Sequence, residues 1–167
     1  MPTKQRRYLI KAKEAKQILT EAQAKVKLDL DALFGSKAIV EVVESDVGEV
    51  YLIGGKPLLF KADGEVLPTL LFTEFTAKAP KIVVDMGAVP YVCKGADVMA
   101  PGIVRIEGEF SKGELVLVVD VKFGKALALG ESLMDAEAAK ATKKGPVVKT
   151  LHYVSDKIWD YTKSLTG

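Results

Sequence analysis

The pattern of apolar and polar positions divides the first part of the chain into a helix followed by short strands. Tyr8–Ile10 predicts a short strand. The residues after it carry apolar side chains at the three- and four-residue spacing of an amphipathic helix, namely Ala15, Ile18, Leu19, Ala22 and Val26. Leu28–Phe34 predicts one or two further helical turns, which end at Gly35.

Strand character dominates the residues that follow. Ala38–Val43 and Val50–Ile53 are apolar and rich in β-branched side chains, which favours strands. Gly54-Gly55 predicts a hairpin turn into a strand over Leu58–Phe60. Pro68–Phe72 predicts a short helix with proline near its start.

The composition then changes, which predicts a domain boundary. Thr76–Lys81 contains little besides alanine, proline and lysine, so we expect a short linker there. The sequence therefore predicts a small N-terminal α+β domain over residues 1–77 and a second domain over residues 78–167.

The second domain is organised around the stretch KIVVDMGAVPYVCKGADVMAPGIVRI. Ile82–Val84 predicts a buried strand, and Ala88–Lys94 predicts a short helix with proline in its first turn. Gly95 stands where helices commonly end in a left-handed residue, and a Pro-Gly turn leads into a strand over Ile103–Ile106. We expect the loop between helix and strand to bring bare backbone amides close to a phosphate or a sugar.

The remaining residues predict more short strands with small helices. Leu115–Val121 is almost continuously apolar, as expected of a strand buried on both faces. We further expect strands over Ala126–Leu129 and Val147–Val154, and a helix over Asp135–Lys144. Ser155 is the expected cap of a final helix, whose apolar side holds Ile158, Trp159 and Leu165. Short strands that close on one another in this way predict a partly open barrel.

Composition excludes several kinds of site. The 167 residues are 49% hydrophobic, and no apolar run approaches the length of a membrane span. One cysteine, Cys93, and one histidine, His152, leave too few soft ligands for a structural zinc site, so we expect no metal and no cofactor. A lone cysteine fits a reducing cytoplasm, where we expect the protein to act. The absence of asparagine, with abundant lysine and glutamate, leans towards a thermophile.

Basic residues gather at both ends of the chain. Residues 1–17 carry six basic side chains against one acidic, and residues 140–167 carry six lysines against two aspartates. Because the formal net charge is only +2, the middle is acidic. Such a surface would meet a polyanion at some places only. Lysines that simply solvate terminal helices are an equally good interpretation.

No motif predicts catalysis. The chain has neither a dinucleotide fingerprint nor a Gly-Lys-Ser/Thr phosphate loop. Cys93 lies among apolar residues, which favours an unreactive core thiol over a nucleophile paired with His152. We therefore predict that the protein is not an enzyme.

Three segments resemble a known family. VVDMGAVPYVCKGADVMAPGIV is similar to the opening of a PUA domain, an RNA-binding module named after pseudouridine synthases and archaeosine transglycosylases. The segments GGKPLLFKADGEVLPTLLF and VVKTLHYVSDKIW resemble the malignant-T-cell-amplified-sequence translation factors and their archaeal relatives. The resemblance implies a C-terminal PUA pseudobarrel and an RNA-binding protein of the translation apparatus, acting at the small ribosomal subunit or on tRNA.

The resemblance also implies partners and site residues. Eukaryotic relatives act on the small ribosomal subunit with a partner that carries a start-codon-recognition domain, so the resemblance implies a partner with an initiation-factor-like domain. An RNA-targeting accessory protein for a tRNA- or rRNA-modifying enzyme is the alternative. The implied RNA contacts, in the loop and on the final strand, are Lys94, Gly95, Ala96, Asp97, Lys149 and His152. Arg6 and Arg7, in the basic N-terminal segment, would extend this footprint.

Two of these contacts have competing structural interpretations. Gly95 would be needed for the turn even without a ligand. Lys149 and His152 are three positions apart, so on a regular strand they point to opposite faces and share a ligand only near a strand end or at a bulge. A hydrogen-bonded structural role is the favoured interpretation for His152.

Overall fold

The computed structural model describes residues 5–166 and forms two compact units. One unit joins the residues before Thr76 to those after Asp156, and the other is Thr76–Asp156. The predicted division placed the last ten described residues in the C-terminal domain. In the structure they group with the N-terminal unit, because the final helix packs beside a strand of that unit's sheet.

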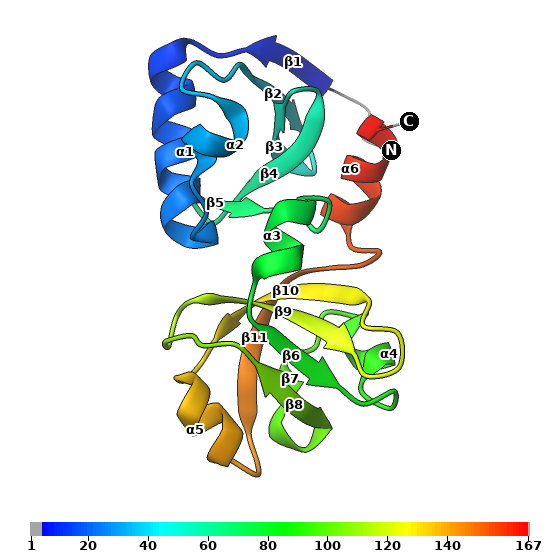
Figure 1. Ribbon diagram of the computed structural model, residues 1–167. Helices are drawn as coiled ribbons and strands as arrows, with labels where there is room; N and C mark the ends of the chain where they lie inside the picture. The colour runs from blue at the N-terminus through cyan, green and yellow to red at the C-terminus, as the bar shows by residue number, and fades with distance from the viewer. Residues whose placement is uncertain (1–4, 167) are drawn as a thin grey trace. The chain divides into compact units, whose positions relative to one another are not determined.

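The N-terminal unit is built on a five-stranded antiparallel sheet, in which the strands follow one another in sequence order (Figure 1). These strands are β1 (Gln5–Leu9), β2 (Val40–Ser45), β3 (Gly48–Ile53), β4 (Lys56–Ala62) and β5 (Glu65–Pro68). The expected hairpin is confirmed, since Gly54 and Gly55 both adopt positive φ, 61° and 80°, between β3 and β4. The sheet is accompanied by the helices α1 (Ala12–Val26), α2 (Leu30–Phe34) and α6 (Lys157–Thr166). Helix α3 (Thr73–Lys78) begins in this unit and continues past the boundary at Thr76.

Helix α1 buries the stripe that the sequence predicts. Four of the five apolar positions are buried and Ile18 is half-buried. One edge of this stripe is joined to β5 by polar contacts. Glu21 Oε1 accepts from the backbone N–H of Val66 at 3.3 Å, and Lys25 Nζ lies 2.5 Å from Glu65 Oε1.

Helix α6 completes this unit with a different face from the one predicted. Tyr161 and Thr162 are its buried residues, whereas Ile158, Trp159 and Leu165 are only half-buried. The Tyr161 hydroxyl donates to Gln5 Oε1 at 2.9 Å, which links the last helix to the first strand. A tyrosine can combine apolar burial with such a polar link, and this explains the shifted face.

The predicted helix over Pro68–Phe72 is wrong. Pro68 is the last residue of β5, which is an edge strand, where a residue without an N–H is tolerated. The helix begins only at Thr73 and continues to Lys78, and β6 begins at Lys81. The expected linker over Thr76–Lys81 is therefore largely helix and strand.

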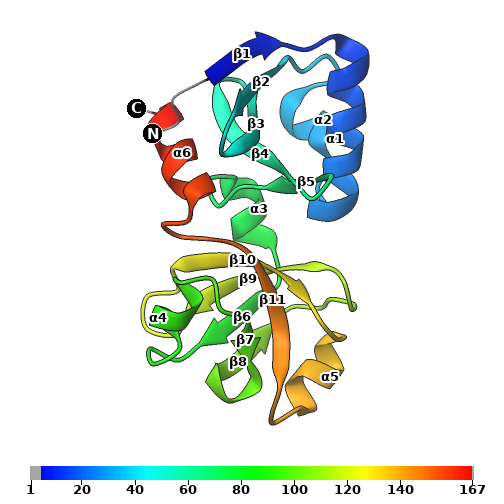
Figure 2. The same ribbon diagram turned by 180° about the vertical axis from the view of Figure 1, so that it is seen from behind.

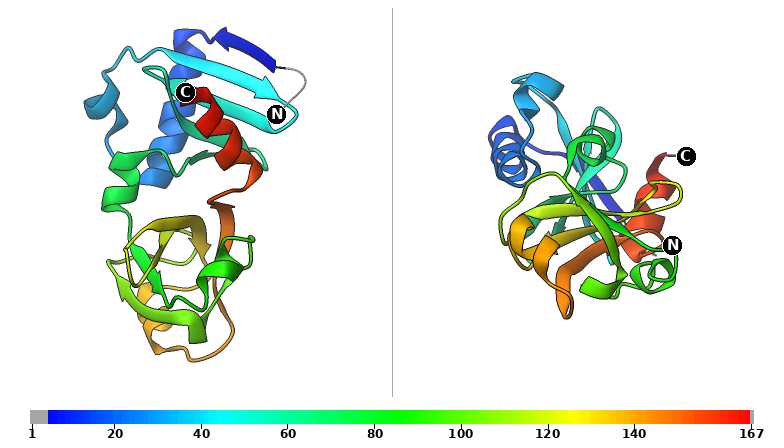
Figure 3. Two further views of the ribbon diagram at one scale, coloured as in Figure 1. Left: turned by 90° about the vertical axis from the view of Figure 1, so that its right-hand side faces the viewer. Right: turned by 60° about the horizontal axis from the view of Figure 1, so that its bottom comes forward.

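The C-terminal unit contains a six-stranded mixed sheet in the order β7-β11-β10-β9-β6-β8, with β6 and β9 parallel. Its strands are β6 (Lys81–Val84), β7 (Val98–Met99), β8 (Ile103–Glu107), β9 (Leu115–Asp120), β10 (Ala126–Ser132) and β11 (Pro146–Tyr153). They curl around a common interior, as expected of a pseudobarrel (Figure 3). The core contains Ile82, Val84, Val116, Val118 and Val148 among its buried residues.

The local predictions for this unit hold with shorter helices. All six residues of β9 are buried, as its apolar run predicts. Helix α4 spans only Val89–Val92, and α5 spans only Ala136–Ala141. The Pro-Gly turn is a single 3₁₀ turn, Ala100–Gly102. Figures 1 and 2 show α4 and α5 at different sides of this unit.

Gly130 on β10 occupies a position where no side chain fits. A Cβ at this residue would lie 2.2 Å from Val148 Cγ1 and 3.1 Å from the Lys149 carbonyl oxygen on β11. Val148 is fully buried, so its side chain has little room to move. The close packing of β10 against β11 therefore depends on this glycine.

We predict that Gly130→Ala lowers the free energy of unfolding by about 1–3 kcal/mol, because it overpacks the barrel interior. Urea unfolding followed by circular dichroism measures the change. Gly87→Ala is the control, since Gly87 does not have a left-handed φ and a Cβ there would meet only the Asp85 carboxylate oxygen, at 3.3 Å. An equal cost for the two variants would contradict the packing argument.

Candidate nucleic-acid interface

A short helix and the loop after it form the core of the candidate interface. Helix α4 begins with proline in its first turn, and Asp85 Oδ1 accepts from the backbone N–H of Ala88 at 2.9 Å, just before the helix. The chain leaves the helix at Gly95, whose φ of 91° lies in the left-handed region, as the sequence predicts. The loop then continues into β7, which pairs with β11.

Thr150 on β11 ties this loop to the last strand. Its backbone N–H donates to Asp97 Oδ1 at 3.1 Å, and its hydroxyl donates to the carbonyl oxygen of Ala96 at 2.9 Å. The two segments that the resemblance implies as an RNA contact, Lys94–Asp97 and the strand that carries Lys149, therefore adjoin one another in the fold (Figure 2).

The expected cradle of bare amides is wrong for the first three residues of the loop. The amides of Lys94 and Ala96 both donate to the carbonyl oxygen of Tyr91, and the amide of Gly95 donates to that of Val92, at 3.0–3.1 Å. These N–H groups are already satisfied, because the loop continues the hydrogen bonding of α4. These three amides are therefore not free to bind a ligand, and Lys94 offers its side chain instead.

Gly95 has a structural role of its own. A Cβ at this residue would lie 2.8 Å from Cε1 of the Tyr153 ring, which packs against the loop from β11. Together with its positive φ, this contact explains the glycine without a ligand. A substitution of Gly95 would disturb Tyr153, so it cannot test RNA binding cleanly.

Lys149 and His152 are separated by a bulge, the exception that the sequence argument allowed. Lys149 pairs with Glu131 and His152 with Leu129, but the register shifts between them, opposite Leu151. The shift places both residues on one side of the sheet by register. Lys149 is exposed, whereas His152 is fully buried.

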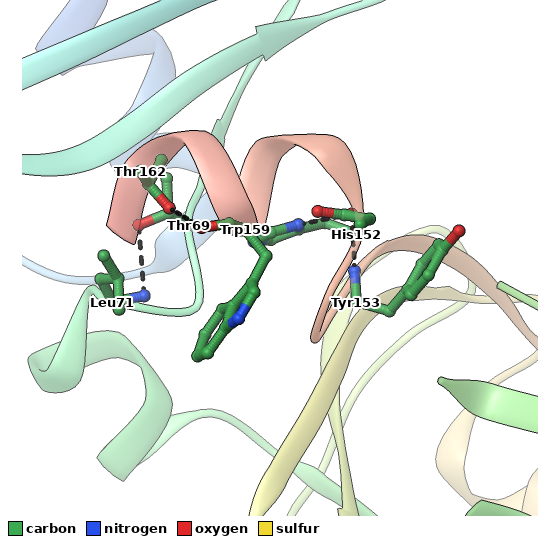
Figure 4. A network of polar contacts seen from close by, with 7 residues as sticks. Thr69, Leu71, His152, Tyr153, Trp159 and Thr162 are labelled. Carbon is green, nitrogen blue, oxygen red and sulfur yellow. Dashed lines mark hydrogen bonds and ion pairs between the residues drawn. The ribbon is translucent and has the colours of Figure 1, made fainter. Parts of the chain in front are cut away.

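His152 is a structural residue rather than an RNA contact. Its Nδ1 lies 2.8 Å from Asp156 Oδ2, and the same oxygen accepts from the backbone N–H of Tyr153 at 2.8 Å (Figure 4). This arrangement agrees with the hydrogen-bonded structural role that the sequence favoured for His152. It does not agree with a direct RNA contact, because the side chain is fully buried. A buried histidine held by a carboxylate stabilises the end of β11.

The exposed groups of the interface are cationic and aromatic. Lys94 and Lys149 are both exposed, and the Tyr91 side chain on α4 is 67% exposed. Ala96 and Asp97 are exposed too, but their polar atoms bind Thr150. The surface can therefore attract a phosphate backbone by charge and offer one ring for stacking.

Arg6 and Arg7 are engaged within the N-terminal sheet. Arg7 Nε lies 2.9 Å from Glu41 Oε2, a hydrogen bond that raises the pKa of Arg7 and lowers the pKa of Glu41. Arg6 Nη1 lies 4.0 Å from Glu44, and its guanidinium lies 4.8 Å from the centroid of the Tyr8 ring. Both arginines are exposed, but acidic neighbours offset part of their charge.

A second basic surface in the N-terminal unit includes a residue that sequence reasoning missed. Lys13 and Lys16 on α1 and Lys37 before β2 line a hollow of about 710 Å³, together with the exposed side chains of Leu9 and Ile39. Lys37 is remote in sequence, so only the fold could join it to the other two. Lys13 and Lys16 themselves lie three residues apart on α1, outside the buried stripe, so they share one exposed face of the helix.

Cys93 and the other potential ligands give no sign of chemistry. Cys93 packs against the C-terminal core, and burial raises the pKa of its thiol. Residues 5–166 contain no group of three histidine, cysteine or acidic side chains placed to hold a metal ion. Over the same residues, no helix is both long and apolar enough to span a membrane.

Two family models match the chain. Residues 80–154 match the PUA domain, and residues 6–74 match a domain of unknown function, DUF1947. Both matches fall inside the regions that the sequence predicted for the two domains. The predicted PUA pseudobarrel and N-terminal α+β part are confirmed by these matches and by the observed sheets.

Full-length relatives give the family. An uncharacterized protein of Methanocaldococcus jannaschii is 36% identical, over 93% of this chain and 96% of its own length. Translation machinery-associated protein 20 of Eremothecium gossypii is 30% identical, over 88% of this chain and 86% of its own length. A probable tRNA pseudouridine synthase B of Pyrobaculum arsenaticum is 38% identical, but over only 65% of this chain and 32% of its own length.

A solved structure agrees with the fold. The crystal structure of a PUA domain from Aeropyrum pernix superposes with a TM-score of 0.84, covering 98% of this chain and 94% of that one at 24% identity. Sequence, fold and full-length relatives thus agree, and the chain belongs to the PUA-domain family that includes translation machinery-associated protein 20.

Proposed function

We propose that the protein is an RNA-binding factor of the translation apparatus that acts in the cytoplasm on the small ribosomal subunit. The observation that carries the proposal is the pairing of Lys94 and Lys149 on two adjoining segments, held together by Thr150. Two exposed cations in fixed positions suit the phosphates of a folded RNA. Kinship with translation machinery-associated protein 20 supports the link to translation.

The mode of action is docking without bond making or breaking. Lys94 and Lys149 position the RNA through its backbone, and the loop amides stay engaged within the protein. The raised pKa of Cys93 keeps its thiol protonated at neutral pH, so it is a poor nucleophile. In this proposal the protein acts by binding RNA and not as an enzyme.

A partner protein with an initiation-factor-like domain is part of this proposal. Neither family model that matches the chain is described as an initiation-factor module. The hollow beside Lys13, Lys16 and Lys37 adds a second cationic surface, which widens the area for subunit contacts.

An accessory role in RNA modification is the second candidate. It rests on the 38% identity to a probable tRNA pseudouridine synthase B over 110 residues. This similarity covers about a third of that protein, so it supports a shared RNA-binding module rather than a shared activity.

We predict that Lys94→Gln and Lys149→Gln each weaken RNA binding and lower the slope of log affinity against log salt by about one, because each removes one phosphate contact. Fluorescence anisotropy with a labelled rRNA hairpin, between 50 and 300 mM salt, measures both quantities.

The matched control is Lys140→Gln on α5. Lys140 is exposed as well, but its Nζ lies 3.7 Å from Glu137 and 4.0 Å from Glu109. Its loss should leave the slope unchanged. A parent chain that binds no RNA at low salt would refute the proposed function, and equal slopes for all three variants would move the contact elsewhere.

We predict that replacing Lys13 and Lys16 with glutamine reduces co-sedimentation with purified small ribosomal subunits at least threefold, by weakening the N-terminal contact. These lysines are better probes than Arg6 and Arg7, because a glutamate at either arginine would face Glu41 or Glu44 and strain the sheet. If sedimentation is unchanged in this variant, the hollow does not contribute to binding of the small subunit.

The same assay separates the two candidate functions. We expect the parent chain to sediment with small subunits and to bind them more tightly than free tRNA. Tight binding to tRNA without sedimentation would favour the modification role.

A further inference from the structure

The turn between β9 and β10 displays an aromatic ring on the surface of the PUA unit. Phe123 is 72% exposed, the largest value among the large apolar side chains of residues 5–166. The turn reads VKFGK, so a lysine stands on each side of the ring in sequence. Phenylalanine is seldom left this exposed without a contact to make.

Asp120 holds the turn from inside. The residue is buried, and its carboxylate accepts from the backbone N–H of Phe123 and, at 3.1 Å, from that of Lys125. These backbone hydrogen bonds, that of Phe123 above all, lower the pKa of Asp120, so it is charged at neutral pH. Gly124 adds a left-handed φ of 65° and donates to the Asp120 carbonyl oxygen at 3.0 Å. The backbone below the ring is thus fixed before any ligand binds.

Cations surround the ring. Lys122 Nζ lies 5.2 Å from the centroid of Phe123, a cation–π distance. Lys122 and Lys125 are both exposed, whereas the carboxylate of the neighbouring Asp120 binds the backbone amides of the turn. The exposed part of the turn is therefore aromatic and positive, which is complementary to a base and its phosphates and not to another apolar protein surface.

The turn lies on the same side of the unit as the candidate interface. The backbone N–H of Val121 donates to the carbonyl oxygen of Val84 at 2.9 Å, where the chain leaves β6 towards α4. Helix α4 is in contact with β10, the strand that begins directly after Lys125. Figures 1 and 2 both show the β9–β10 connection beside α4. An RNA held at Lys94 can therefore reach the turn.

We infer that residues 121–125 form a stacking platform for one unpaired nucleotide, with its base on Phe123 and its flanking phosphates at Lys122 and Lys125. This inference rests on the proposed RNA binding and adds a preference for RNA with a single-stranded segment next to a helix. A paired base cannot reach the ring, because its faces are covered by the neighbouring base pairs.

The test uses the full chain and two RNAs, a fully paired duplex with an unpaired 3′ tail and the same duplex with blunt ends. Phe123→Ala should weaken binding to the tailed RNA about tenfold and to the blunt RNA less than twofold. The salt slope should not change, because no charge is removed. Phe123→Trp should keep the affinity of the parent, since a larger ring still stacks.

Val104→Ala is the matched control, because Val104 is a half-exposed apolar residue on β8 outside this turn. It should leave both affinities unchanged. Equal unfolding midpoints for all variants establish that the fold is intact.

Several outcomes would overturn the inference. If Phe123→Ala binds the tailed RNA as the parent does, the platform is refuted while the proposed function stands on the lysine variants. Equal losses on both RNAs would refute single-strand stacking. Loss of ribosome sedimentation with unchanged RNA affinity would assign Phe123 to a protein contact. No RNA binding by the parent would refute this inference together with the proposed function.

Discussion

Two hydrogen bonds from one threonine hold the candidate interface together. Thr150 donates from its backbone N–H to Asp97 and from its hydroxyl to Ala96. The position of the loop that carries Lys94 is therefore fixed relative to β11. Thr150 in turn pairs with Gly130, where the absence of a side chain lets β10 and β11 pack closely. The position of the surface cations is therefore set by packing in the barrel interior, and binding and stability are coupled at this strand pair.

The local pattern of the sequence predicted most elements because local forces determine them. The stripe of α1, the glycine hairpin after β3 and the left-handed Gly95 all follow from spacing or backbone freedom. Pro68–Phe72 was assigned to a helix because proline favours helix starts, but the same proline also fits the end of an edge strand. The pairing of Pro68 with Leu59 across the β4–β5 hairpin decides between the two, and Leu59 lies outside the segment Pro68–Phe72 itself.

The candidate site was harder to predict for the same reason. Lys94 and Lys149 are surface residues of adjoining segments, as the family resemblance implied, yet the loop amides are bonded to α4 and His152 lies in the interior. Exposure of a backbone N–H depends on the hydrogen bonds of its neighbours, which no motif records. Phe123 was missed although VKFGK carried a signal, an aromatic residue between lysines at a hairpin turn.

The arginines and lysines of the predicted site have different roles in the structure. Arg7 forms an ion pair with Glu41 in the N-terminal sheet, whereas Lys94 and Lys149 are exposed on the surface.

The placement of α6 has a consequence for how the chain matures during synthesis. The N-terminal unit contains residues from both ends of the described chain, with the PUA unit inserted between them. The barrel has all its strands once Asp156 has left the ribosomal tunnel, but the first unit still lacks the helix whose Tyr161 reaches back to Gln5. The N-terminal unit, whose strands are synthesised first, is thus completed after the PUA unit. Its five-stranded sheet lacks α6 throughout the synthesis of the barrel. Completion of the N-terminal unit therefore requires that the PUA unit and the helix after it have been made first.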